Sequence, residues 1–549
     1  MTNSKKASGG DTKPATKDPS KVAGKQADKE YTNLLHRLRR WILFGCDEVY
    51  RSCMRRSIGR WFPTEENVRV YKKSFKINCI RLINQALINL ADKGTVEDNA
   101  VRTRLLENVE KTVMENASHS IPGTVPFILS QMREYEHLRP LVATLINKIP
   151  LMSADLMLFN LYVQKIKGAT SVIRRAIGQW YTEHTDNPEM IKDILLRKRR
   201  SGWTHADIVK IWHIPDNISI LLKIVLGFPV DLTSIQDDER RKLVVDCLKL
   251  RNLNSKNVFL KLLEDEEYLD KYGDFMLTHI KSQLYCKEAV LVAVKRVSDN
   301  DLIQAIPRML LIFPNVEVVL NALLNRLKKI NSPASINLMS LWLTSRWLSW
   351  RKDKEDVKKK KPMENVLVEL NRLLSSYPKS EDEVLIVAHW EHSMENFEEV
   401  ILRRSRVGLQ MRPAICPDLL KSVEFLCLLL FFYPNHRLIA GKSHYQIKSA
   451  SNPSEILPTL LKIRAKTAET IPEVNKKISN LIMFALDNCV DNNDLKAKVQ
   501  TYGPQRMVVI TKDKVKTCIP ENPIPRKTLV IHGFDLNFLS LIQKMFTLL

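Results

Sequence analysis

Glycine is scarce in this 549-residue sequence, with 16 residues in all. Soluble proteins usually contain about 7% glycine. Leu, Ile, Lys and Arg are abundant instead, a composition that favours helices. The chain is also too long to be organised around one hydrophobic core. We therefore expect a mainly helical protein with several core units or a repeat array.

The sequence lacks the motifs of common enzymes. It contains no Walker loop, no G-x-S-x-G and no H-E-x-x-H. Acidic clusters occur at 236–240 and 264–267, but they are typical of solvated surfaces rather than of metal or acid–base pairs. We therefore expect a binding protein and not an enzyme.

Long apolar runs and a signal-peptide core are also missing. The most apolar stretch, from Val423 to Tyr433, contains Glu424 and is shorter than the roughly 20 residues that span a bilayer. The nine cysteines are scattered, with no C-x-x-C pair, which indicates free thiols and gives no zinc site. We expect a soluble protein without cofactors in the cytoplasm, with the nucleus as a second compartment.

The charge is strongly of one sign. The formal net charge is +24, and by a rough count only about +5 of it falls in residues 377–549. A field of this sign attracts polyanions, nucleic acid first, and the asymmetry indicates binding to the N-terminal two-thirds. The alternative is a soluble basic protein without such a partner.

Hydrophobic periodicity separates a tail from a long helical region. Residues 1–29 have almost no aliphatic side chains, so we expect a disordered basic tail. Residues 30–376 are predicted to form a helical-repeat domain, because apolar residues recur three and four apart and prolines fall between segments. Within it, the lysine-rich segment 351–362 is expected to be a solvated loop. Clear helical segments lie at 80–91, 102–115, 137–149, 153–166 and 172–184.

The pattern changes in residues 377–549. Short β-rich runs alternate there with helical stretches such as 417–432. Strands that alternate with helices indicate a parallel α/β domain, smaller than the helical one. The β-rich runs lie at 383–389, 437–441, 506–510 and 528–533.

Basic and aromatic residues are densest between Lys165 and His213. Arginine and lysine bind phosphates, and exposed rings can stack on bases. For Trp180, Trp203 and Trp212, packing in the core is favoured over stacking, because large aromatic side chains bury the most area. The candidate nucleic-acid-binding residues are Lys165, Lys167, Arg174, Arg175, Lys198, Arg199, Arg200, His205 and Lys210.

A capped helix is predicted inside this stretch. Thr204 is a suitable N-cap, and Asp207 follows it three residues later, so the helix should begin at His205. Its first turn would direct free N–H groups and the ring of His205 toward a phosphate. The alternative for His205 is a buried structural histidine.

Several segments together resemble the TROVE module of the Ro autoantigen family. IRRAIGQWYTEH (173–184) and RRSGWTHADIVKIWHI (199–214) resemble its signature stretch. The resemblance implies a ring of HEAT-like helical repeats followed by a von Willebrand factor A-like α/β domain. Further similar segments, which spread it over nearly all of 31–549, are LLHRLRRWILFG (34–45), INKIPLMSADLMLF (146–159), SPASINLMSLWLTSR (332–346) and HGFDLNFLSLIQKMFTLL (532–549).

The resemblance also implies a function. Members of the family bind small noncoding RNAs, called Y RNAs, on the basic outside of the ring. They take single-stranded 3′ ends of misfolded RNAs into the central hole, in RNA quality control. By this resemblance we expect a monomeric ribonucleoprotein component, with no membrane or DNA partner. The alternative is a helical-repeat scaffold for other proteins that has lost RNA binding.

Two features depart from the family pattern. AIPRMLLIF (305–313) stands where a more polar, lysine-containing helix is usual, which favours binding on the outside of the ring over threading through it. The second departure concerns the metal site of the α/β domain. In A-type domains that bind metal, the first strand ends in D-x-S-x-S.

Aligned on IVAHWEHSM, that strand end carries His389, Glu391 and Ser393, of which only the serine matches. Thr467 can be placed at the metal-binding threonine of the family, and Lys512 at its distal aspartate. A divalent cation prefers oxygen ligands and would meet an ammonium group here. The resemblance therefore implies that the metal site has degenerated.

Magnesium and manganese are accordingly expected not to raise the melting temperature of the protein, because an ion stabilises the folded state only by binding to it. Thermal unfolding with and without millimolar magnesium tests this. A rise of several degrees that Ser393→Ala abolishes would contradict the prediction.

Overall fold

The structure is a computed structural model of the whole chain. The residues that it describes are 19–46, 49–51, 77–121, 123–163, 171–184, 187–197, 203–215, 219–279, 286–313, 317–353, 357–389, 422–440, 443–447, 450–462, 479–485, 504–511, 528–532 and 537–548.

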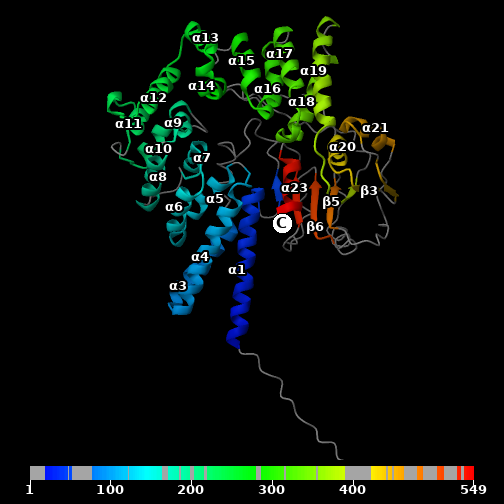
Figure 1. Cartoon of the computed structure of the whole chain (residues 1–549). Coiled ribbons are helices and arrows are strands. Elements are labelled where there is room, and N and C mark those ends of the chain that lie inside the picture. The colour runs from blue at the N-terminus through cyan, green and yellow to red at the C-terminus, as the bar shows by residue number, and fades with distance from the viewer. Residues whose placement is uncertain are drawn as a thin grey trace, which may run out of the picture.

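Helices make up most of the described residues between 19 and 375, and Figure 1 shows that α3 to α19 lie around an arc. All five helical segments predicted at 80–184 are confirmed. In chain order the helices are α1 (Pro19–Phe44), α3 (Asn78–Lys93), α4 (Val96–Ala117), α5 (Thr124–Met132), α6 (Arg139–Lys148), α7 (Ser153–Val163), α8 (Ser171–Glu183), α9 (Pro188–Leu196), α10 (His205–Ile211), α11 (Ile220–Leu226), α12 (Asp238–Arg251), α13 (Lys256–Glu264), α14 (Glu266–His279), α15 (Lys287–Arg296), α16 (Asp299–Ile312), α17 (Glu317–Lys328), α18 (Leu338–Asp353) and α19 (Val357–Ser375).

Local sequence explains where these helices begin and end. In α3 the buried residues Ile80, Ile83, Leu87 and Leu90 recur three and four apart, which gives the helix one apolar face. Gly94 then ends it with a φ of 67°, a conformation that costs glycine little. Helix α4 follows directly.

Two expectations about this region are wrong. Helix α1 begins at Pro19, so residues 19–29 are helical rather than part of a disordered tail. A helix anchored by packing can extend beyond the core, since each further residue needs only its backbone hydrogen bond. The lysines at 358–361 lie in α19 rather than in a loop, because the apolar residues that follow them in α19 pack in the core.

The C-terminal part is built on a mostly parallel sheet in the order β1-β7-β6-β5-β2-β3-β4. Only β4 is antiparallel to its neighbour. All four predicted β-rich runs are strands, whereas β1, β4 and β5 were not predicted. The elements are β1 (Val49–Arg51), β2 (Val384–His389), α20 (Ser422–Phe432), β3 (His436–Ala440), β4 (Ser443–Tyr445), α21 (Pro453–Lys462), β5 (Asn480–Ala485), β6 (Arg506–Thr511), β7 (Thr528–His532) and α23 (Phe538–Leu548).

The first strand of the sheet comes from the N-terminal region. Val49 and Arg51 of β1 pair in parallel with Val530 and His532 of β7. Just before β1, the buried guanidinium of Arg40 in α1 donates to the carbonyl of β7 residue 528 at 2.7 Å. The two ends of the chain therefore meet in one sheet, and the arc of helices closes through the α/β part (Figure 1).

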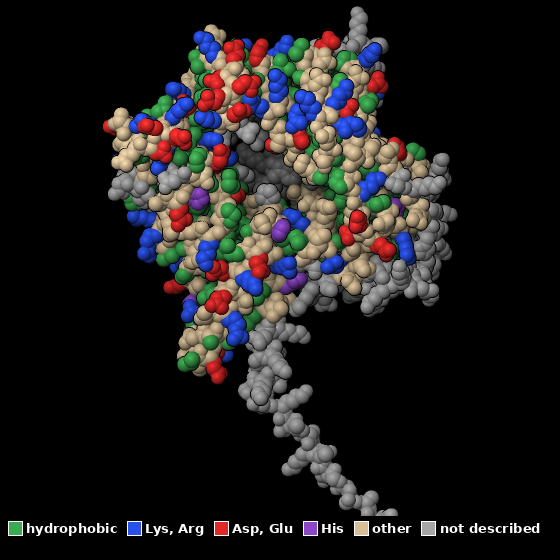
Figure 2. All heavy atoms as spheres, in the orientation of Figure 1, with side chains coloured by type: hydrophobic (Ala, Val, Ile, Leu, Met, Phe, Trp, Pro, Cys, Tyr) green, Lys and Arg blue, Asp and Glu red, His purple; other side chains and the backbone are tan. Residues whose placement is uncertain are grey.

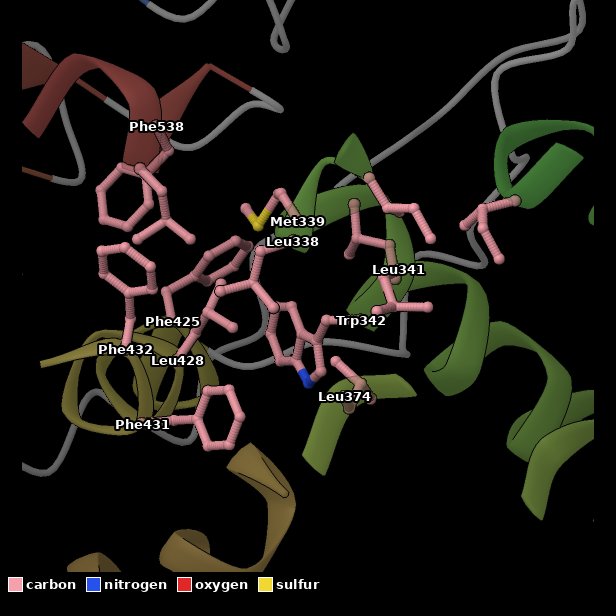
Figure 3. Close-up of a cluster of buried hydrophobic side chains, with 14 of the residues drawn as sticks. Leu338, Met339, Leu341, Trp342, Leu374, Phe425, Leu428, Phe431, Phe432 and Phe538 are labelled. Atoms are coloured by element: carbon pink, nitrogen blue, oxygen red, sulfur yellow. The ribbon is translucent and has the colours of Figure 1, made fainter. Parts of the chain in front are cut away.

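The hydrophobic core divides near α15 and not where the secondary structure changes after α19. One cluster extends from α1 to the start of α15. The other contains most of α15 to α19 together with the strands, α20 and α23. Figure 3 shows its centre, where Trp342 of α18 meets Phe425 of α20, with ring centroids 5.6 Å apart, and Phe538 of α23 packs on Phe425. The last helices of the arc and the sheet thus share one core.

Figure 2 shows a hollow in one face of the molecule, below the upper helices of the arc. Lys and Arg side chains are interspersed with Asp and Glu on this face, so the positive charge does not gather there into one patch. Among the described helices, none is both long and apolar enough to span a membrane.

The ion pair between Arg346 of α18 and Glu424 of α20 spans the shared core, with 2.6 Å between Nη2 and Oε1. Arg346→Met is expected to lower the free energy of unfolding by about 2 kcal/mol or more, because it leaves a buried carboxylate without its guanidinium. Urea unfolding measures this. The double variant Arg346→Met/Glu424→Leu should regain most of the lost free energy of unfolding. If the double variant is less stable than Arg346→Met alone, the ion pair does not stabilise the contact between α18 and α20.

Candidate nucleic-acid interface

Helices α7, α8 and α10 are joined by side chains of the predicted binding stretch. The hydroxyl of Tyr181, in the last turn of α8, lies 2.7 Å from Nδ1 of His205, the first residue of α10. The indole N–H of Trp180 donates to the carbonyl of Leu151, just before α7, at 3.2 Å. The end of α8 therefore lies beside the start of both α7 and α10.

The other ends of α7 and α10 are joined as well. The indole N–H of Trp212, which follows α10, donates to the side-chain oxygen of Asn160 near the end of α7. Helix α10 consequently runs in the same direction as α7.

Helices α8 and α10 carry exposed cations. Arg174 and Arg175 near the start of α8 and Lys210 in the last turn of α10 are exposed, and none of them has a hydrogen-bond or carboxylate partner in the described part of the chain. By contrast, the exposed Lys148 of α6 is paired with Glu110 at 2.6 Å. Uncompensated positive charge of this kind attracts phosphates.

His205 does not occupy the phosphate-facing position that we expected. The predicted capping box is present, with Thr204 accepting from the backbone of Asp207 and the Asp207 side chain accepting from the backbone of Thr204. The ring of His205, however, is only 2% exposed. Burial lowers the pKa of His205 to about 4, so the imidazole is neutral at pH 7 and offers no charge to a phosphate. Its position matches the structural alternative.

A buried polar cluster lies next to His205. Asp193 is 2% exposed and accepts hydrogen bonds from Ser153 and from the guanidinium of Arg197, whose Nε lies 2.8 Å from its carboxylate. Arg197 therefore serves to tie the end of α9 to the start of α7. Because the charge of Arg197 is balanced by that of Asp193, Arg197 adds little to the positive electrostatic field around it.

The three tryptophans of the stretch are core residues, as predicted. Trp180, Trp203 and Trp212 are 0%, 6% and 1% exposed. The guanidinium carbon of Arg133 lies 5.6 Å from the ring centroid of Trp212, an attraction between a cation and an aromatic face. None of these rings is available to stack on a base.

The remaining predicted positions divide as follows. Lys165, Lys167, Lys198, Arg199 and Arg200 lie outside the described residues, as do Glu391, Ser393, Thr467 and Lys512 of the degenerate metal site. His389 is the last residue of β2. Within the described ranges, no three His, Cys, Asp or Glu side chains are grouped so that they could hold a metal ion.

One exposed residue directly after α10 was missed. His213 follows Trp212 and is exposed. Its backbone has a φ of 49°, a conformation that the sequence does not reveal. The only available signal was its position directly after the predicted helix.

The arrangement of the whole chain matches a solved structure. The crystal structure of the Deinococcus radiodurans Ro (RSR) protein matches it with a TM-score of 0.59, over 93% of this chain and 99% of that chain, at 12% sequence identity. The chain has the fold of a Ro protein. This confirms the expected fold class, a helical-repeat ring followed by a smaller α/β domain of von Willebrand factor A-like type.

Of the three comparisons with known proteins, the comparison of structures detects the Ro fold. No model of a known protein family and no curated protein sequence matches this chain. At 12% identity the core positions are largely occupied by different side chains, and the apolar pattern rather than the identity of residues maintains the fold.

The buried His205 should make stability depend on pH. Its folded pKa of about 4 lies below the unfolded value of 6.5, so its contribution is present above pH 6.5 and is lost as the pH falls toward 4. The free energy of unfolding should decrease by about 2 kcal/mol from this residue between pH 7 and pH 5. Urea unfolding at both pH values measures the decrease, and His205→Gln should remove most of it. An unchanged pH dependence in that variant would show that the imidazole is not buried in its neutral form.

Proposed function

We propose that this protein is an RNA-binding ribonucleoprotein component that binds small structured noncoding RNA, of the kind represented by Y RNA. It acts by binding and not as an enzyme. We further propose that it receives single-stranded 3′ ends of misfolded RNA, as a monomer in the cytoplasm, in RNA quality control. The observation that carries the proposal is the set of exposed cations Arg174, Arg175 and Lys210, which have no carboxylate partner among the described residues.

The chemistry of this group suits a phosphate backbone. Guanidinium groups bind phosphate oxygens through two parallel hydrogen bonds, and an ammonium group adds a point charge. Figure 1 shows α8 on the outer side of the arc, away from the α/β part, where a folded RNA has access. From the sequence alone, Lys165, Lys167 and Lys198 to Arg200 are further candidates for contacts to RNA.

The net charge of +24 supports the same partner. A field of this sign raises the encounter rate with any polyanion, and local unpaired cations then determine where it binds. The Ro fold and the resemblance to the TROVE signature stretch are both consistent with this function. His205 takes part by holding α10 against α8 rather than by touching RNA.

Replacing the three cations tests the surface. In Arg174→Gln/Arg175→Gln/Lys210→Gln, the affinity for a structured hairpin RNA should fall by about 100-fold at 0.1 M salt, since each of the three lost contacts to a phosphate is worth roughly 1 kcal/mol. The slope of log affinity against log salt should become shallower by about 2, at roughly 0.7 for each phosphate. Binding is measured by fluorescence anisotropy at several salt concentrations.

The matched control is Arg251→Gln/Lys256→Gln/Lys261→Gln on α12 and α13, which removes the same net charge from other exposed positions. It should leave the affinity within about threefold of the unmodified protein, because distant exposed charges are screened. Equal losses in both variants would mean that only the overall charge matters. If the unmodified protein bound no structured RNA, a helical-repeat protein scaffold would become the better explanation.

A further inference from the structure

A cavity lies between helices α12, α13 and α14, with a volume of about 360 Å³. Pockets of roughly 300 to 1,000 Å³ hold small molecules in other proteins. Figure 1 shows these three helices on the part of the arc away from the sheet. The described side chains that line the cavity come from these helices and the turns between them, not from α8 or α10. The cavity is therefore distinct from the cations proposed to bind RNA.

Part of the lining is apolar and aromatic. Leu253 and Leu262 contribute aliphatic side chains, and Tyr268 of α14 contributes a half-buried ring. The hydroxyl of Tyr268 donates to the backbone carbonyl of Asp246 at 3.5 Å, and its ring centroid lies 4.6 Å from that of Tyr272. A ring fixed in this way suits a planar aromatic ligand, because stacking on it immobilises no further side chain.

A buried carboxylate also lines the cavity. Asp246 of α12 is 8% exposed, and its Oδ2 accepts a hydrogen bond from the hydroxyl of Tyr272 at 3.1 Å. The ammonium of Lys249 lies 3.6 Å from Oδ1, which is too far for a good hydrogen bond. A carboxylate has about four acceptor sites. Asp246 is thus oriented by Tyr272 and can still accept N–H groups of a ligand in the cavity.

Exposed lysines line the same cavity. Lys242 and Lys249 lie four residues before and three residues after Asp246 on α12, so the three side chains share one face of the helix. An ammonium group binds a phosphate as a point charge. A ligand with only positive charge would be repelled by these lysines and by the net charge of +24. The lining therefore favours a ligand with N–H donors and an anionic group.

Two further carboxylates of the lining have positive partners of their own. Glu267 pairs with Lys271, with 3.1 Å between Oε1 and Nζ. Asp265 accepts from the backbone N–H of Tyr268, in the first turn of α14, at 2.9 Å. The N-terminus of a helix stabilises such a negative charge. These two acids consequently offset little of the attraction that the lysines of α12 have for an anion.

A planar ring, N–H donors and an anionic group occur together in a nucleotide. Among the four common bases, guanine presents two adjacent donors, N1–H and the 2-amino group, which match the two oxygens of a carboxylate. Adenine and cytosine have an acceptor nitrogen next to their amino group, and uracil has a carbonyl on either side of its N–H. Next to Asp246, these acceptors would face another acceptor.

We infer that the cavity binds a guanine nucleotide. The base stacks on Tyr268 and donates to Asp246 through N1–H and the 2-amino group, while the phosphate lies near Lys242 and Lys249. Free guanosine monophosphate (GMP) and an unpaired guanosine of an RNA present the same chemistry to this site. The inference goes beyond the proposed function, since it does not depend on the cations of α8 and α10.

Calorimetric titration of the full chain with GMP, AMP, CMP and UMP tests the site. GMP should bind about 10-fold more tightly than AMP or better, because AMP loses at least one hydrogen bond to the buried carboxylate. Guanosine, which lacks the phosphate, should bind more weakly than GMP at low salt. This difference should shrink as the salt concentration rises, because the exposed lysines are then screened.

Asp246→Asn separates recognition of the base from an effect on folding. The amide group would face the donors of guanine, so the affinity for GMP should fall by about 10-fold or more. Xanthosine monophosphate carries a carbonyl in place of the 2-amino group and should bind this variant better than it binds the unmodified protein. A misfolded variant could not gain this affinity.

Two other variants complete the set. Tyr268→Leu keeps an apolar side chain without the ring, and should weaken GMP binding about 5- to 100-fold, the range expected for one lost stacking contact. Asp238→Asn is the matched control, because Asp238 is on the same helix but does not line the cavity. It should change the affinity for neither GMP nor xanthosine monophosphate.

Competition distinguishes the two sources of guanine. If GMP displaces a hairpin RNA with one unpaired guanosine, but not the same hairpin with adenosine at that position, the site binds RNA. If GMP binds and displaces neither hairpin, the site binds the free nucleotide. Both results support a guanine site in this cavity.

Three results would overturn the inference: no binding of GMP to the unmodified protein, equal affinities for GMP and AMP, or an unchanged affinity for GMP in Asp246→Asn. The proposed function is judged separately, by the hairpin RNA and the variant of Arg174, Arg175 and Lys210. If that variant lost affinity for RNA while GMP bound nowhere, the proposed function would stand and the guanine site would be wrong.

Discussion

The pairing of β1 with β7 is the contact on which the shape of the whole molecule depends. It brings together residues about 480 positions apart, and the adjacent hydrogen bond from Arg40 spans 488 positions. Closing so long a segment costs entropy, although the cost grows only slowly with length. Because α1 is fixed to the sheet at one edge and α18 packs against α20 near the other end of the arc, the helices between them must form a closed arrangement. An arc free at either end could bend; this one cannot open without breaking the sheet.

The same contact solves a problem of the sheet itself. A parallel sheet must be covered on its faces and protected at its edges. β1 covers the edge of β7, and the short antiparallel β4 covers the edge of β3. Since α18 and α19 also share the core of the sheet, the α/β part depends on the helical part for its packing. Secondary structure and packing thus divide this protein at different places.

Helices α8 and α10 contribute both buried side chains that hold the helices together and exposed cations. Trp180, Tyr181, His205 and Trp212 point inward and hold three helices in register. The same helices also carry the exposed cations Arg174, Arg175 and Lys210. Burying a neutral histidine against a phenol makes the framework rigid without an unbalanced charge. Similarity in such a stretch therefore reflects the buried framework as much as the exposed contacts.

The sequence by itself determined the elements whose signal is local. The spacing of Ile80, Ile83, Leu87 and Leu90 predicts a helix, and Thr204 with Asp207 predicts where α10 begins. The runs around β2, β3, β6 and β7 predict a parallel sheet. These patterns lie within one turn or one strand, so a short window contains all the information. The division of charge along the chain was likewise readable without a structure.

Only the tertiary structure decided which residues face solvent and which strands meet. β1 has three residues, too few for a periodic signal, and its place is set by a partner at the other end of the chain. His205 is buried because Tyr181, 24 residues away, receives its ring, whereas His213 is exposed in a left-handed conformation that the hydrogen bonds at the end of α10 impose. The burial of His205 depends on a neighbour distant in sequence, which a local pattern does not contain.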